Sequence, residues 1–165
     1  MKGGIFLNIG SYEINNETLV IMPFGKNQSK VYEISGDFIV NMSPLNIIKA
    51  SCLYFGSSYE GRKESAKYTA GIEMKVPVLI EESRNIIFFP TTSCINAESI
   101  WISFQNLVRY NKISDKDTLL IFRENRQLKV NIRYNLVDNQ VVRCIKIDTL
   151  LKRRKEFLDS NNFVV

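Results

Sequence analysis

The sequence predicts an α+β fold built mostly from antiparallel strands, with a central helical pair and a basic helix at the C-terminal end. Short β-branched and aromatic runs recur along the chain, and only a few polar residues separate one run from the next. Helical spacing of apolar residues is confined to the middle and the end. Because 165 residues suit one domain and no linker or repeat divides them, we expect a single domain over 1–165 with loose ends near 1–10 and 160–165.

The first half opens with two strand-like runs, 12–24 and 31–42, which a loop containing Gly, Asn and Ser joins into a hairpin. A helix is predicted over about 44–55. Ser43 supplies a capping hydroxyl directly before a proline, and apolar residues then recur at helical spacing. Gly56 follows at the position where a left-handed residue commonly ends a helix.

A second helix is predicted from about residue 59 to 69. Ser57 and Glu60 have the Ser-x-x-Glu spacing of a capping box, in which each side chain binds the backbone N–H of the other residue. Gly61 lies inside this segment and weakens the helix by about 1 kcal/mol relative to alanine.

Strand-like runs dominate the second half up to residue 147. Their aromatic residues Trp101, Phe88, Phe89 and Phe104 are interpreted as core side chains rather than as a base-stacking platform. Asp148 is a candidate N-cap, so we expect an amphipathic, basic helix from there to about residue 160. The predicted strands are 75–81, 85–93, 99–110, two runs within 118–134 around a turn at 124–126, and 139–147.

Positive charge is concentrated in the second half of the chain. Residues 1–82 contain 8 Lys/Arg and 9 Asp/Glu, a net charge of −1, whereas residues 83–165 contain 14 and 8, a net charge of +6. This asymmetry favours a polyanionic partner, with nucleic acid first and a membrane surface second. No apolar run approaches the roughly 18 residues of a membrane span, so we expect no membrane-spanning segment.

The chain has no histidine and three scattered cysteines, Cys52, Cys94 and Cys144. The absence of histidine excludes Ser-His-Asp and Cys-His catalysis and the usual general base near neutral pH. The cysteine spacings support neither a disulfide framework nor a zinc site, so these residues are interpreted as reduced core residues. A metal-dependent nuclease would need clustered carboxylates, which are lacking. We therefore expect no cofactor, no metal and no enzymatic activity.

Gly56, Gly61, Arg62 and Lys63 come close to the phosphate-binding pattern G-x-x-x-x-G-K-[ST]. Arg62 occupies the lysine position, Lys63 occupies the hydroxyl position, and the preceding segment is helical rather than strand-like, so a nucleotide site is rejected. Three interpretations remain: an anion-binding turn near a helix start, a helix-turn-helix unit, or two helix caps beside a solvated charged face.

Five segments, "VNMSPLNIIKASCLYFGSSYEGRK", "KVPVLIEE", "IIFFPTTS", "WIS" and "YNLVDNQVVR", resemble the ComK family of competence transcription factors of Gram-positive bacteria. The similarity extends over about residues 10–157. The resemblance implies a cytoplasmic, nucleoid-associated DNA-binding activator of DNA-uptake genes. Its implied partners are double-stranded promoter DNA with paired A/T-rich boxes, a second copy of the chain in dimers that assemble further, and RNA polymerase. The implied approach is from the minor groove, which separates A·T from G·C pairs and attracts arginine and lysine where it is narrow.

The familiar member of the family continues past the segment resembling "KRRKEF" into a longer C-terminal tail, which takes part in recognition by a proteolytic adaptor. This chain ends at Val165, so the resemblance leaves control by that adaptor open. The short tail also supports an alternative function. In that alternative the protein is a non-activating, protein-interaction paralogue that pairs with a full-length activator and modulates it.

The candidate DNA contacts form three groups. In the first, Arg62 and Lys63 are predicted to enter a groove, while one lysine and two serines nearby contact phosphates. The second is a pair of arginines flanking a hairpin tip near Asn125, and the third is the basic run 152–155. For each group the alternative is a structural role, as a brace, a solvated turn or a solvated helix face. The candidates are Ser57, Ser58, Arg62, Lys63, Lys67, Arg123, Arg126, Lys152, Arg153, Arg154 and Lys155.

Overall fold

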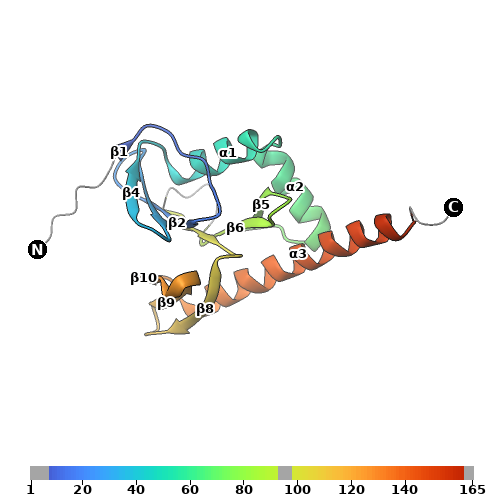
Figure 1. The fold of residues 1–165 in the computed structure, drawn as a ribbon. Coiled ribbons are helices and arrows are strands. Elements are labelled where there is room, and N and C mark those ends of the chain that lie inside the picture. The colour runs from blue at the N-terminus through green and yellow to red at the C-terminus, as the bar shows by residue number, and fades with distance from the viewer. Residues whose placement is uncertain (1–7, 93–97, 162–165) are drawn as a thin grey trace, which may run out of the picture.

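The structure, a computed structural model, describes residues 8–92 and 98–161 (Figure 1). The described part contains two sheets and three α-helices, which confirms the predicted α+β class. In chain order the elements are β1 (Asn8–Ile9), β2 (Thr18–Pro23), β3 (Ser29–Glu33), β4 (Asp37–Val40), α1 (Pro44–Tyr54), α2 (Tyr59–Ala70), β5 (Val78–Glu81), β6 (Ile86–Pro90), β7 (Trp101–Ser103), β8 (Leu107–Lys112), β9 (Thr118–Phe122), the 3-10 turn η1 (Arg123–Asn125), β10 (Gln127–Val130) and α3 (Tyr134–Asn161).

The larger sheet has seven strands in the order β1-β4-β3-β2-β7-β6-β5, and the smaller has three in the order β10-β9-β8. All neighbouring strands are antiparallel except β1 and β4, which pair in parallel. The predicted preference for antiparallel strands is therefore confirmed.

The central strands of the larger sheet are buried on both faces, because successive side chains of a strand point to opposite sides. On one face Phe88 and Trp101 pack in a cluster with residues of α1. On the other face Phe89 and Ile102 pack with Leu120 of β9 and with apolar residues of α3. Trp101 and both phenylalanines are almost fully buried, which confirms their interpretation as core residues.

The predicted caps of α1 are confirmed. The Ser43 hydroxyl accepts a hydrogen bond from the Asn46 backbone N–H at 3.3 Å. Gly56 has a φ of +86°, in the left-handed region that favours glycine. A helix, not a strand, thus precedes the Gly56–Gly61 segment, which agrees with the rejection of a phosphate loop.

The predicted capping box of α2 is wrong by one residue. Ser58, not Ser57, is the N-cap, and its hydroxyl accepts from the Gly61 backbone N–H at 3.1 Å. The position that a capping box gives to glutamate is therefore occupied by Gly61. A Cβ at Gly61 would stand 2.9 Å from the Ser58 hydroxyl oxygen, so the glycine leaves room for the cap.

The predicted strand 139–147 is wrong, and so is the helix start at Asp148. Both segments lie within α3, a single helix of 28 residues. The buried residues Val137, Cys144 and Ile147 are spaced to share the helix face that meets the rest of the protein. Asp148 lies within the helix, where its carboxylate accepts a hydrogen bond from the Lys152 ammonium at 2.8 Å.

Two other predicted strands are each divided by a turn. The run 31–42 continues from β3 into β4, and 99–110 contains β7 and β8, which belong to different sheets. Of the expected loose ends, residues 8 and 9 form β1, and 160 and 161 end α3. Residues 1–7 and 162–165 of those ends lie outside the described residues, as does Cys94.

Cys52 and Cys144 are buried and free, as interpreted from the sequence. Burial raises the pKa of the Cys52 thiol to about 11 and raises that of Cys144 well above its ordinary value. None of the helices described combines the length and the apolar character that crossing a membrane requires.

The two sheets are joined at Asn106, a buried residue between β7 and β8. Its amide nitrogen donates to the carbonyl oxygens of Asn16 and Thr18, both at 3.0 Å. Its amide oxygen accepts from Nε of Arg123 at 2.8 Å, and Nη2 of Arg123 donates to the Asn16 carbonyl at 3.0 Å. One asparagine thus ties the segment before β2 to the end of β9.

We expect Asn106→Ala to lower the free energy of unfolding by about 3 kcal/mol, because it leaves buried backbone carbonyls without a donor. Urea denaturation followed by circular dichroism measures this change. The matched control is Asn111→Ala at an exposed position of β8, which should change the free energy of unfolding by less than about 0.5 kcal/mol. Equal stability of the two variants would contradict the proposed role of Asn106 in joining the two sheets.

Candidate nucleic-acid interface

Ser57 and Ser58 lie in the turn between α1 and α2, where both hydroxyls bind the chain itself. The Ser57 hydroxyl donates to the Cys52 carbonyl oxygen at 3.2 Å, and its backbone N–H donates to the same oxygen at 2.9 Å. Ser58 caps α2. Their side chains therefore close one helix and open the next.

Arg62 lies on the side of α2 that faces the body of the protein. It is half-buried, and its Nε is buried and has no hydrogen-bond partner among the residues that the structure describes. The residue lines a cavity of about 40 Å³ together with Glu82, between α2, β5 and α3, where Ile147 and Leu151 of α3 also contribute. A positive charge thus stands at the junction of three elements.

Lys63 and Lys67 lie on the same helix and are half-buried. The Lys63 ammonium lies 5.9 Å from the centre of the Tyr59 ring. Acidic residues share the exposed side of α2, and one of them, Glu60, forms an ion pair with Lys49 at 3.8 Å. The exposed side of α2 is therefore mixed in charge rather than uniformly basic, which weakens the helix-turn-helix interpretation.

The basic run of α3 is partly bound to neighbouring elements. The Lys155 ammonium lies 2.9 Å from a carboxylate oxygen of Glu82, in the turn between β5 and β6. A guanidinium nitrogen of Arg154 donates to the Thr69 hydroxyl of α2 at 3.0 Å. Lys152 pairs with Asp148 on its own helix. Arg153 is exposed.

Arg123 and Arg126 flank the hairpin turn between β9 and β10, as predicted, and both bind residues far away in the sequence. Arg123 contacts Asn106 and Asn16. Arg126 forms an ion pair with Asp37 at the start of β4. Glu124 between them has a positive φ, as a tight hairpin turn requires. The two arginines therefore join the small sheet to the large one.

The structure brings the first and third candidate groups together and leaves the second apart. Figure 1 shows α3 running from the three-stranded sheet past α2 toward the C-terminal end. The Arg154–Thr69 contact holds the basic run of α3 beside α2, and Lys155–Glu82 joins the same run to the turn between β5 and β6. We call this region, formed by residues 59–70 and 152–155, the α2–α3 surface.

The basic character of the three-stranded sheet was not predicted from the sequence. Residues 107–133 contain seven Lys/Arg and three Asp/Glu, a net charge of +4 out of the +5 of the whole chain. The available signal was the alternation of charged and polar residues along β8 and β10, which places them on one face. Of the seven cations, only Arg123 and Arg126 were predicted from the sequence as DNA contacts.

Among the residues described, no group of three or more His, Cys, Asp or Glu side chains is arranged to hold a metal ion. Three carboxylates near the candidate contacts are paired with a cation, in Glu82–Lys155, Asp148–Lys152 and Asp37–Arg126. The chemistry of these surfaces is therefore that of ion pairing and hydrogen bonding.

Comparison with known proteins identifies relatives of the chain. A family model described as "ComK protein" matches residues 9–156. The competence transcription factor of Bacillus subtilis (strain 168) is 35% identical over 159 residues, which cover 90% of this chain and 83% of that protein. No solved structure shows significant similarity to the chain.

The Lys155–Glu82 pair has a consequence that depends on pH. The hydrogen bond and the charge of Lys155 lower the pKa of Glu82, with a smaller contribution from Arg62. Lys155→Gln should therefore raise the pKa of Glu82 toward its ordinary value, as measured by an NMR titration of the Glu82 carboxyl carbon.

A lowered glutamate pKa stabilises the folded state above the pKa of the unfolded chain, and this contribution is lost as pH falls through the folded-state pKa. The stability difference between wild type and Lys155→Gln should therefore disappear on acidification, and it should be small because both side chains are half-exposed. Lys152→Gln, whose partner is Asp148, should leave the Glu82 titration unchanged. An identical Glu82 titration in Lys155→Gln and wild type would exclude the pair in solution.

Proposed function

Because the chain belongs to the ComK protein family, we propose that it is a DNA-binding transcriptional activator of competence genes. The observation that carries the proposal is 35% identity to a competence transcription factor across 90% of the chain. The net charge of +6 in residues 83–165 supports it, since a polyanion attracts such a surface. Targets with paired A/T-rich boxes and an approach largely through the minor groove complete the proposal.

The proposed contact region is the α2–α3 surface. Arg62 and Lys63 would approach the groove, while Lys67 and the basic run of α3 would contact phosphates. Narrow A·T minor grooves have an enhanced negative potential, which favours inserted arginine and lysine. The backbone N–H groups at the start of α2 would add to the phosphate contacts, together with Ser57 and Ser58. Arg123 and Arg126 belong to the same proposal as a separate, smaller contact at the hairpin turn.

Pairing of the boxes leads us to propose that two or more copies bind one promoter, since each box would receive one chain. A dimer places two identical surfaces at a fixed spacing along the duplex, and half-site spacing then selects the target. RNA polymerase is the further proposed partner, because activation requires a contact with the transcription machinery.

The proposal predicts selective binding. The protein should bind a duplex with two A/T-rich boxes roughly 10³-fold more tightly than a scrambled duplex of the same length and composition at physiological salt. Fluorescence anisotropy over a range of salt concentrations measures both affinities. Equal affinity for the two duplexes would rule out sequence-selective recognition.

We expect Arg62→Ala to weaken binding to the paired-box duplex about tenfold, while the melting temperature falls by no more than a few degrees. Anisotropy and thermal denaturation measure the two effects on the same preparation. The control Lys26→Ala removes one exposed charge in the turn between β2 and β3 and should change neither quantity. A large loss of melting temperature that accompanies the loss of affinity would instead assign Arg62 to bracing α2 against β5 and α3.

A further inference from the structure

We propose that the outward face of the three-stranded sheet is a second surface that contacts the phosphates of duplex DNA, separate from the α2–α3 surface. This inference rests on the proposed function and adds a contact to it. The basic sheet face, as we call it, consists of Arg109, Asn111, Gln127 and Lys129 on the strands and Lys116 in the loop between β8 and β9.

Strand register places the side chains of Arg109, Asn111, Gln127 and Lys129 on one side of the sheet, and Lys116 lies in the loop at the end of that sheet. The opposite side carries Leu120, Phe122 and Val130, which are buried in the core. Neighbouring strands lie about 4.8 Å apart, so β8 and β10 present their side chains about 10 Å apart across β9. The rows on this side are Arg109–Ile121–Gln127 and Asn111–Leu119–Lys129, in which the β9 residues are buried or half-buried and the β8 and β10 residues are exposed.

Charge complementarity identifies the partner. The segment 107–133 has a net charge of +4, compared with +1 for α2 and +2 for α3. The duplex presents one negative charge per 1.7 Å of its axis. Arginine, lysine, asparagine and glutamine all donate hydrogen bonds, and phosphate oxygens accept them. The most basic part of the protein therefore exposes donors suited to a phosphate backbone.

The two acidic residues of the β8–β9 loop pair with two of the seven cations of this segment. Asp115 pairs with Lys112 at 3.1 Å, and Asp117 pairs with Lys129 at 3.8 Å. Arg109 and Lys116 are exposed, and within residues 8–92 and 98–161 neither forms an ion pair. These two side chains are therefore available to contact a polyanion.

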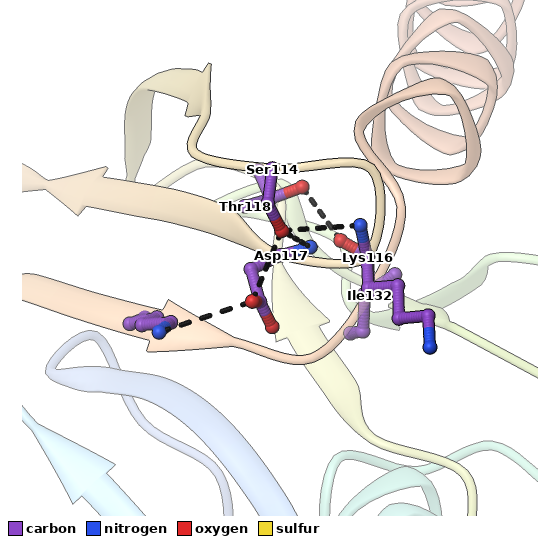
Figure 2. Close-up of polar contacts among 6 residues, drawn as sticks. Ser114, Lys116, Asp117, Thr118 and Ile132 are labelled. Atoms are coloured by element: carbon purple, nitrogen blue, oxygen red, sulfur yellow. Dashed lines mark hydrogen bonds and ion pairs between the residues drawn. The ribbon is translucent and has the colours of Figure 1, made fainter.

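The loop is ordered before any partner binds. The Ser114 hydroxyl accepts from the backbone N–H groups of Lys116 and Asp117, at 3.2 and 3.1 Å, and donates to the Asp117 carboxylate at 3.1 Å. The Thr118 hydroxyl donates to the Ile132 carbonyl at 2.6 Å. Figure 2 shows these bonds and shows the Lys116 side chain extending away from them. A loop that is already ordered loses less entropy on binding.

The basic sheet face and the α2–α3 surface lie toward opposite ends of α3. The Tyr110 hydroxyl of β8 donates to Asp138 near the start of the helix at 2.8 Å, whereas the basic run occupies 152–155. At 1.5 Å per residue these positions are about 20–25 Å apart along the helix. Loss of one surface can therefore be measured without altering the other.

Loss of a phosphate contact and loss of a base contact should change DNA binding in different ways. We expect Arg109→Gln and Lys116→Gln each to reduce the slope of log K against log salt by about one. Each should weaken binding to paired-box and scrambled duplexes by the same factor, roughly five- to tenfold near 0.1 M salt. Fluorescence anisotropy between about 50 and 200 mM salt measures slopes and affinities. Melting temperatures should not change, because both side chains are exposed.

Two controls separate charge from position. Lys26→Gln removes one exposed charge outside the basic sheet face and should retain the wild-type slope, while Lys116→Arg keeps the charge and should do the same. Wild-type slopes and affinities in Arg109→Gln and Lys116→Gln would overturn the inference. A loss confined to the paired-box duplex would overturn the assignment to phosphates.

The proposed function can fail independently of this inference. Equal wild-type affinity for both duplexes would remove sequence selectivity, and the salt slopes of the variants would still decide the basic sheet face. Preserved selectivity with unchanged slopes would retain the function and reject the surface. Absence of wild-type binding to either duplex would reject both.

Discussion

The burial of the central strands on both faces is the constraint on which the rest of the structure depends. Because β2, β6 and β7 carry apolar side chains on each side, other elements must pack against both faces of the sheet. The helix α1 packs on one face, and the three-stranded sheet with α3 packs on the other. The outer sides of these elements remain open to a charged partner, and they include α2, the end of α3 and the outward face of the small sheet.

Cations hold the layers together as well as forming those surfaces. Arg126 with Asp37 and Arg123 with Asn106 join the two sheets. Arg154 with Thr69 holds the end of α3 beside α2, and Lys155 with Glu82 joins it to the turn after β5. A residue with such a contact must exchange an internal partner for a phosphate if it is to bind DNA. Arg109 is exposed and forms no ion pair with any residue that the structure describes, so it has no such contact to exchange.

The accuracy of the sequence predictions depended on how local each signal was. The Ser43 cap and the left-handed Gly56 were correct because both are set by neighbouring residues. The strand predicted over 139–147 was wrong. The valines and isoleucines of this segment favour a strand intrinsically, whereas packing of one helix face against the rest of the protein favours the helix. For the site, sequence located the basic half of the chain but selected only two of the seven cations of the small sheet.

The sequence by itself determined the family, the α+β class, the first helical pair and the excess of positive charge in the second half. These properties are sums over residues or patterns between near neighbours. Only the tertiary structure decided which cations are bound internally and which face solvent. Asp37 and Arg126 are 89 positions apart, and the register of three strands places Arg109 and Lys129 on one face. Such pairings depend on packing between distant segments, for which a single sequence contains no local signal.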